Sequence, residues 1–446
     1  MPLTTARLRC LAIAVLLMGG RDGGASEPIV LTVQEGVRLA LAQHEDLRMA
    51  HAAVSQSQQG VREARAEILP QLTASGSYTR NWLLPTAVFN NQTLKIGSDN
   101  GAAGTLRLTQ ALYTGGRSSG RIGSAREQVA AAREALRAVE QETRARVEAA
   151  FYEYLLAREL AGVSDLRLRL ARSAQGDAEA LRRAGRVPEY DVIRARVQVA
   201  ASQADSIGAA NQLELSEVRL KDAMGLQLDA LIRVDAAFRE ESELSTRDLP
   251  ELVERSLASR PEYRQLRARL AAARRQIAVE RAGSRPTVDL VASGQMQFQN
   301  DQLDKVSAGE EWRRSWATGL ALQVPLFDGR RTNARVAQAS LEVRRLEARQ
   351  AQLERAVGLE VRSAWLDLAE TRERLGARRA AVAEATSGLG IAEARYRSGS
   401  GTQLEVLDAH LSVVQAESGY AQARRDRAVA LVQLERVVGV LGESAQ

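Results

Sequence analysis

The amino-acid sequence predicts a mainly α-helical protein with a small β part, built as two structural repeats of long coiled-coil helices plus strand pairs. Three observations predict this fold class: an internal repeat, a helix-forming composition and long intervals without proline. The repeat is exact in spacing, because residues 108–117 align with residues 322–331 and Gly185 aligns with Gly399, both at an offset of 214 residues. An offset this long indicates two copies of one large structural half rather than a solenoid.

Composition and proline placement indicate long helices. Of the 446 residues, 26% are charged and only 4% are aromatic, and the good helix formers Ala, Leu, Arg, Glu and Gln are abundant. Proline is absent between Pro85 and Pro188 and again after Pro325. Because an internal proline costs a helix about 3 kcal/mol, these intervals permit very long helices.

Residues 1–26 read as a signal peptide. Arg7 and Arg9 form a basic start, residues 11–18 form a short apolar core, and small residues follow near residue 26. The only cysteine is Cys10, inside this segment, so we expect no disulfide or thiolate metal site in the exported chain. Positive charge is interspersed with glutamate rather than grouped, which argues against a nucleic-acid partner.

Each repeat is predicted to contain a helix, two strands and a helical hairpin. Alternating apolar and polar residues, as in residues 286–299 and 315–327, have the period of a strand. The first repeat, 27–230, is assigned a helix at 32–68, strands at 71–84 and 102–113, and a hairpin at 117–225. The second repeat, 231–446, is assigned a helix at 248–284, strands at 286–299 and 315–327, and a hairpin at 331–441.

The hairpin turns have recognisable end signals. Gly185 and Gly399 suit the left-handed residue that ends a helix, and Pro188 suits the first position of the next helix. In the second hairpin, Thr402 and Glu405 have the spacing of a capping box. Both hairpins are therefore expected to turn near residues 185–190 and 398–404.

The strands have the length of tilted membrane strands, which need about 9–11 residues. Four strands cannot close a barrel, and an open edge in lipid leaves backbone groups unsatisfied. The chain is therefore expected to pool its strands with other copies. Two copies would give eight strands, a barrel filled by side chains, and three copies would give twelve, which leaves room for a lumen.

Four segments together resemble a known family. They are residues 69–72 before the first strand, the strand-to-helix junctions at 112–117 and 326–330, and residues 396–409 at the second turn. In this order and in two copies they resemble the TolC-type outer membrane efflux channel family, also called outer membrane factors. One departure is His44-Glu45, where the family has Asn-Pro; the second repeat keeps a proline at Pro261.

The resemblance implies a homotrimer with a twelve-stranded transmembrane β-barrel continued by a helical periplasmic barrel. It implies contact with outer membrane lipid of a Gram-negative bacterium, and helix tips that meet a periplasmic adaptor (membrane fusion protein) and an inner-membrane pump. The implied function is the outer membrane channel of a tripartite efflux or type I secretion system. Two alternatives stay open: a non-transporting secreted coiled-coil structural protein, and a periplasmic adaptor subunit.

The candidate pore constriction lies at the start of each return helix. Glu405 and Asp408 are three residues apart, hence on one helix face, and rings of acid favour cations in pores. In the resembling family the matching acidic positions ring the constricted tip. Acids in a first helical turn also simply stabilise the helix dipole, so a structural role competes. The first-repeat equivalents, Asp191 and Arg194, are opposite in charge, and we expect a local salt link between them.

Three further groups are structural or contact candidates. The resemblance implies adaptor contact at the hairpin tips, whereas ordinary turn chemistry also accounts for their glycines. Aromatic residues near strand ends suit a membrane-interface girdle, or packing in a small barrel. The adaptor-contact tips are Gly185, Arg186, Pro188, Gly399, Ser400 and Gly401; the strand–helix junctions are Gly115, Gly116 and Gly329; the interface aromatics are Tyr78, Trp82, Trp312 and Trp316.

No catalytic pattern stands out. The three histidines, His44, His51 and His410, are scattered, and the sequence has no phosphate loop, Ser-His-Asp order or paired catalytic carboxylates. We therefore predict no enzyme, no cofactor and no metal site.

Overall fold

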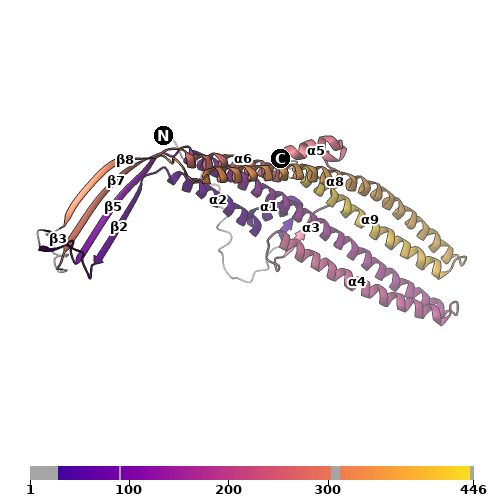
Figure 1. The fold of residues 1–446 in the computed structure, drawn as a ribbon. Helices are drawn as coiled ribbons and strands as arrows, with labels where there is room; N and C mark the ends of the chain where they lie inside the picture. Colours follow the sequence, from indigo (N-terminus) through magenta and orange to yellow (C-terminus); the bar gives the residue numbers. More distant parts are fainter. Residues whose placement is uncertain (1–28, 90–91, 303–311, 442–446) are drawn as a thin grey trace, which may run out of the picture.

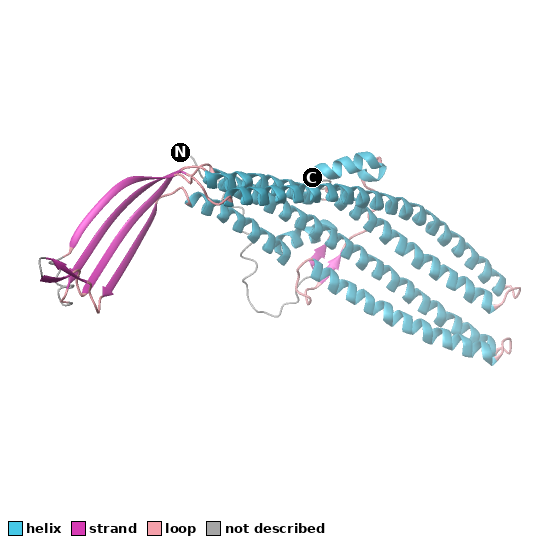
Figure 2. Cartoon of the chain, viewed as in Figure 1, coloured by secondary structure: helices cyan, strands magenta, loops and turns pink. Residues whose placement is uncertain are grey.

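The computed structural model describes residues 29–89, 92–302 and 312–441, so the expected signal peptide lies outside the described residues. The molecule is elongated, with a four-stranded sheet at one end and two helical hairpins at the other (Figures 1 and 2). Among the described residues, no helix combines the length and the apolar character needed to cross a membrane.

The two hairpins form the long arm. The first consists of α3 (Arg117–Arg183) and α4 (Glu189–Ala223), and the second of α8 (Arg331–Arg397) and α9 (Gln403–Val438). Helices α3 and α8 each have 67 residues, which is about 100 Å at 1.5 Å per residue. Their equal length follows from the constant offset between the repeats.

The helices expected at 32–68 and 248–284 are each divided in two, which corrects the prediction of single helices. The first becomes α1 (Val33–Gln43) and α2 (Glu45–Ala66), and the second becomes α5 (Leu249–Ser259) and α6 (Pro261–Arg281), followed by a short 3-10 turn (Ala282–Ser284). The dividing residues His44 and Arg260 have extended backbones, with ψ of 137° and 125°.

The breaks have a physical cause in each repeat. Pro261 disfavours a helical conformation at Arg260, while in the first repeat the ring nitrogen of His44 caps α2 by accepting from the Asp46 N–H at 3.3 Å. The end of each return helix abuts the break, since Gly225 approaches His44 and Gly439 approaches Arg260. A continuous helix would leave no place for these ends.

The sheet contains β2 (Gln71–Arg80), β5 (Asn100–Tyr113), β7 (Thr287–Asn300) and β8 (Arg313–Gln323) in the order β2-β5-β7-β8, all antiparallel. Strands β2 and β8 form its two edges. β2 is shorter than predicted because the chain turns after Arg80 toward a small hairpin of β3 (Thr86–Phe89) and β4 (Gln92–Lys95). β8 ends at Gln323, ahead of Pro325, which lacks the N–H that a ladder needs.

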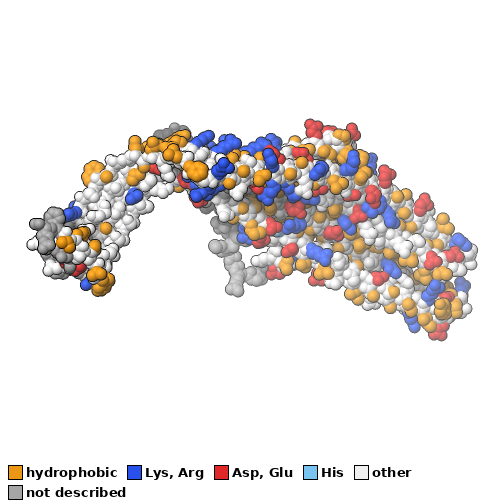
Figure 3. All heavy atoms as spheres, viewed as in Figure 1, with side chains coloured by type: hydrophobic (Ala, Val, Ile, Leu, Met, Phe, Trp, Pro, Cys, Tyr) orange, Lys and Arg blue, Asp and Glu red, His pale blue; other side chains and the backbone are white. Residues whose placement is uncertain are grey.

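The strand register separates an apolar face from a polar face. Leu72, Leu108, Ala292 and Thr318 lie in one row, whereas the neighbouring row contains Thr73, Arg107, Ser293 and Ala317. Because side chains alternate along a strand, neighbouring rows point to opposite sides. In the space-filling view the sheet shows few charged side chains, whereas Lys and Arg side chains gather over the adjoining helices (Figure 3).

A small parallel pair joins the two repeats. β1 (Ile29–Leu31), at the start of the first repeat, pairs with β6 (Ile232–Val234), at the start of the second. The main hydrophobic core lies beside this pair and includes Phe151, Leu220 and Val432 from three different helices. The predicted boundary at residue 230 therefore does not separate two independent bodies, because both repeats contribute to one core.

The strand-to-helix junctions are built alike with different residues. Thr114 Oγ1 accepts from the Ser118 N–H at 3.1 Å, and Asp328 accepts from the Thr332 N–H at 2.8 Å. Hydrogen bonds from the Thr332 hydroxyl and backbone N–H lower the pKa of Asp328. Each junction then has two successive residues with positive φ; in the first repeat both are glycines.

Gly115 (φ 65°) and Gly116 (φ 93°) fill these positions in the first repeat, and Gly329 (φ 68°) and Arg330 (φ 65°) in the second. A Cβ on Gly115 would lie 2.7 Å from the Cβ of Arg285, so this site excludes a side chain. The three predicted glycines thus have a conformational role. Arg330 is the one described non-glycine residue with positive φ.

Candidate functional site at the hairpin tips

Both tips are closed by the same backbone motif. At the first tip, the Arg186 N–H donates to Leu181 O at 2.9 Å, and Gly185 has a φ of 73°. At the second, the Ser400 N–H donates to Arg395 O at 3.0 Å, and Gly399 has a φ of 79°. These bonds satisfy the last carbonyls of α3 and α8 and fix where each chain reverses.

The six predicted contact residues lie on these turns. Gly185, Arg186, Pro188, Gly399 and Ser400 are exposed, and Gly401 is half-buried. A side chain at Gly185 or Gly399 would meet nothing within 4 Å. The glycines are thus required by backbone conformation and not by crowding.

Glu405 is tied to its own hairpin. Thr402 Oγ1 accepts from the Glu405 N–H at 3.3 Å, which is one half of the expected capping box. The carboxylate lies 3.3 Å from Nη1 of Arg395 on α8. Its charge is therefore partly neutralised across the turn.

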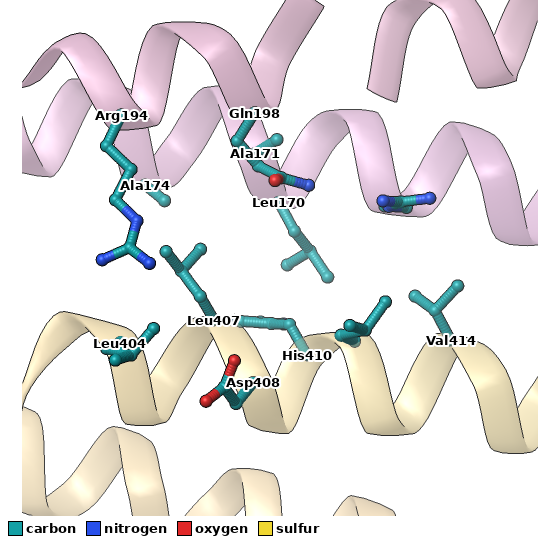
Figure 4. A pocket seen from close by; sticks show the side chains of 12 residues that line it. Leu170, Ala171, Ala174, Arg194, Gln198, Leu404, Leu407, Asp408, His410 and Val414 are labelled. Carbon is teal, nitrogen blue, oxygen red and sulfur yellow. The ribbon is translucent and has the colours of Figure 1, made fainter. Parts of the chain in front are cut away.

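Asp408 has different surroundings from Glu405. It lines a cavity of about 180 Å³ between the two hairpins, together with Arg194 of α4 and Leu170 of α3. Figure 4 shows Arg194 directed from α4 toward the face of α9 that carries Leu407 and Asp408. One side of α9 thus faces the other hairpin.

The salt link expected between Asp191 and Arg194 is absent. Among the residues that the structure describes, neither forms an ion pair, because Arg194 reaches across the groove instead of back along α4. The charges at the first tip are joined by Arg182 and Glu189, whose side chains lie 3.2 Å apart across the turn.

Sequence reasoning placed Tyr396 in the second-tip segment but missed its contact with the first hairpin. Its pKa is raised by burial, with Asp177 and Asp191 raising it further, so its phenol lies near carboxylates of both helices in the first hairpin. The period of α8 alone could not reveal this contact, because it depends on how one hairpin packs against the other. Glu179 has its pKa lowered by hydrogen bonds from Gln175 and Arg196.

The predicted interface aromatics lie at the end of the sheet away from the helices. Tyr78 and Trp316 belong to the apolar face, and the Tyr78 hydroxyl donates to Asn100 at 2.7 Å. Trp82, which is 85% exposed, has the preceding Arg80 guanidinium 4.7 Å from its ring centre. The ring of Trp312 packs 5.8 Å from that of Phe298.

Within residues 29–89, 92–302 and 312–441, no group of three or more His, Cys, Asp or Glu side chains is arranged to hold a metal ion.

Comparison with known proteins gives a consistent result. The family model described as "Outer membrane efflux protein" matches residues 36–226 and 252–440, one match in each repeat. Protein CyaE of Bordetella pertussis is 28% identical over 93% of this chain and 85% of its own length. Outer membrane protein TolC of Escherichia coli is 24% identical over 98% of this chain and 87% of its own length.

Solved structures share the fold. A crystal structure of CusC, described in connection with transmembrane channel formation, superposes with a TM-score of 0.77 at 20% identity, covering 91% of this chain and 92% of its own. The outer membrane protein VceC of Vibrio cholerae gives 0.76 at 20% identity, covering 91% and 96%.

Proposed function

The chain belongs to the outer membrane efflux protein family, whose members are channel components and not enzymes, and on that premise we propose how it assembles and closes. As an outer membrane channel of an efflux or type I secretion system, it extends from the membrane into the periplasm. The family match in both repeats sets aside the alternatives of a secreted structural fibre and a periplasmic adaptor.

We propose that three copies assemble into one channel. The observation that carries this proposal is the sheet with an apolar face and two open edges, β2 and β8. In lipid, each edge must find a partner, because unpaired backbone groups cost several kcal/mol each. Pairing β8 of one copy with β2 of the next gives twelve strands, a number large enough to leave a lumen.

The proposed constriction is the inner end, where the hairpin tips of three copies would converge. Asp408 is the stronger candidate for the ion path, because it is exposed and lacks an ion pair among the described residues. Glu405 would contribute a charge already reduced by Arg395. Asp191 and Arg194 would set the charge on the facing hairpin.

The exposed turns support docking of a periplasmic adaptor at the tips. An inner-membrane pump would then deliver cargo to the channel. Relatives named for efflux and for protease secretion are consistent with such an assembly. Cysteines placed at Arg186 and Ser400 are expected to cross-link to the adaptor in cells. A cysteine at Glu373, on α8 but 24 residues before its end at the tip, is the control that should not cross-link.

The test of the channel is single-channel conductance of the purified protein in planar bilayers. We expect a small cation-selective conductance in the wild type, and loss of selectivity in Glu405→Gln/Asp408→Asn, with the larger part due to Asp408. Glu373→Gln, an exposed acid on α8 away from the tip, is the matched control. Identical selectivity in all proteins would remove these carboxylates from the constriction.

A further inference from the structure

A groove runs between the two hairpins just behind the tips. It consists of two adjoining cavities of about 180 and 270 Å³, which share Leu170 and Ala174 of α3 and Leu407 and His410 of α9. The shared lining is apolar except for His410. His410 is therefore the one titratable side chain that lines both cavities.

His410 is held in a poorly solvated position. Its side chain is 20% exposed, and its Nε2 lies 3.7 Å from Oε1 of Glu393 on α8. Its Nδ1 is buried and has no hydrogen-bond partner among the described residues. Burial lowers the pKa of this imidazole, and the nearby Glu393 carboxylate opposes that shift only in part.

The charges around His410 divide by hairpin. Its own hairpin presents the carboxylates of Glu393 and Asp408 and the phenol of Tyr396. The facing hairpin presents Arg167, Arg194 and Asp177. Arg167 is paired with Asp205 at 2.6 Å, which leaves Arg194 and Asp177 as the unpaired charges across the groove.

Only groups across the groove can link protonation to hairpin separation. Glu393 and Asp408 stay with His410 whether the hairpins are together or apart, so they stabilise an imidazolium in both arrangements. A change in equilibrium requires a difference between the two states. The difference comes from the apolar wall of α3, which excludes water, and from Arg194 of α4, which repels a cation; Asp177 opposes this repulsion.

We propose that His410 is a positioning residue: its neutral imidazole keeps the two hairpins of one chain together, and its protonation releases them as the periplasm becomes acidic. The sign follows from burial. A base that is harder to protonate in the packed state stabilises that state above its pKa, and this contribution is lost as pH falls. One proton can shift the equilibrium by at most about tenfold per pH unit. The step from released hairpins to a conducting channel rests on the proposed function.

The test measures hairpin packing without requiring conduction. Hydrogen–deuterium exchange is recorded on the whole detergent-solubilised protein at pH 5.5 and 7.5, and corrected for the intrinsic pH dependence of amide exchange. Protection of residues 167–174 and 404–411 is expected to fall by up to about tenfold per pH unit at acid pH. Protection along α6 should not change.

Three variants make the result specific. His410→Gln is expected to keep full protection at both pH values, because glutamine cannot be protonated. His51→Gln, which alters an exposed histidine on α2, should behave like the wild type. Glu393→Gln removes the anion that favours the imidazolium, so the loss of protection should begin at lower pH. An unchanged pH response in His410→Gln, or none in the wild type, overturns the proposal.

Conductance recorded over the same pH range separates this inference from the channel proposal. If acid pH loosens the groove in a His410-dependent way but no variant conducts, the channel proposal fails and the histidine switch stands. If the protein conducts but neither protection nor opening depends on His410, the switch fails and the channel stands.

Discussion

The two repeats are alike in backbone and different in charge. The return helices α4 and α9 both end in a left-handed glycine, Gly225 and Gly439, with the same closing hydrogen bonds. One turn earlier the buried residues are opposite: Lys221 in the first repeat and Glu435 in the second. The two repeats thus share their backbone geometry at equivalent positions. The sign of a buried charge can differ between them, provided that the charge of its partner differs as well.

The partners differ in kind. Lys221 Nζ lies 2.8 Å from Glu217 on its own helix and donates to Leu228 O at 3.2 Å. Glu435 accepts from both terminal nitrogens of Arg239, at 2.9 and 2.5 Å, and from Ser242 at 2.6 Å. The first contact is local, whereas the second fastens α9 to the segment that joins the two repeats.

The largest expected effect is at Glu435. Its side chain is only 3% exposed, so Glu435→Gln should lower the free energy of unfolding by about 3–5 kcal/mol, because Arg239 would lose its buried counter-charge. Urea unfolding in detergent, followed by circular dichroism, measures this. Lys221→Gln should lower the free energy of unfolding by less, since water can solvate the Glu217 carboxylate. Equal losses in the two variants would contradict this difference between the Lys221 and Glu435 contacts.

The closing glycines should respond unequally, although both have a left-handed φ, 68° at Gly225 and 82° at Gly439. A Cβ at Gly439 would lie 2.9 Å from the backbone nitrogen of Arg260, whereas at Gly225 the nearest atom, Cα of His44, is 3.5 Å away. Gly439→Ala is expected to cost about 2–4 kcal/mol, from left-handed strain plus overlap. Gly225→Ala should cost about 1–2 kcal/mol, from strain alone. Thermal melts of both variants measure the two losses of stability. A larger loss in Gly439→Ala indicates crowding, whereas equal losses indicate that backbone strain alone sets the cost.

A third test uses pH. Burial and the neighbouring Glu435 raise the pKa of Glu148 to about 7, while its second-repeat counterpart Arg362 is exposed. Because the folded protein holds this proton more tightly, stability is full below about pH 4.5 and declines as pH rises through 7. Glu148→Gln should remove that decline and gain about 3 kcal/mol at pH 8. Urea unfolding of both proteins at pH 5 and pH 8 measures this gain. An equal gain at the two pH values would contradict the prediction.

The smallest expected effect is at the strand–helix junction. Arg330 occupies a left-handed position that Gly116 fills in the first repeat. Arg330→Gly should raise the free energy of unfolding by about 1 kcal/mol, because the strain of a non-glycine residue is relieved. Gly116→Ala should lower it by a similar amount. A loss of stability in Arg330→Gly would show that the arginine side chain makes a contact worth more than its strain.

Much of the fold could be predicted from residues with local consequences. Gly185, Gly399 and Pro188 reveal the tips because left-handed and first-turn positions admit few residue types. The alternation in residues 286–299 predicts a strand because one face is apolar. The break at His44 could not be predicted this way, since it exists to receive the end of α4, nearly 180 residues later.

The site was less accessible to prediction for the same reason. Helical spacing places Glu405 and Asp408 on one face, but their environments come from two other helices: Arg395 of α8 and Arg194 of α4. Opposite signs at Asp191 and Arg194 suggest a local pair, yet the arginine is drawn across the groove. The position of His410 likewise depends on packing between the hairpins, which no single-helix pattern records.

The parallel pair of β1 with β6 also constrains the order in which the protein can be built. Leu31 pairs with Val234, so the earliest described residues to leave the export machinery wait for about 200 more before they find their partner. Long-range pairing of this kind slows folding, because the closure entropy is lost before any contact is gained. The helices of the first hairpin, α3 and α4, can form and pack while this strand is still unpaired. β1 therefore forms its native pairing late in folding. Until β6 is available, correct folding depends on keeping this short apolar strand from pairing with another molecule.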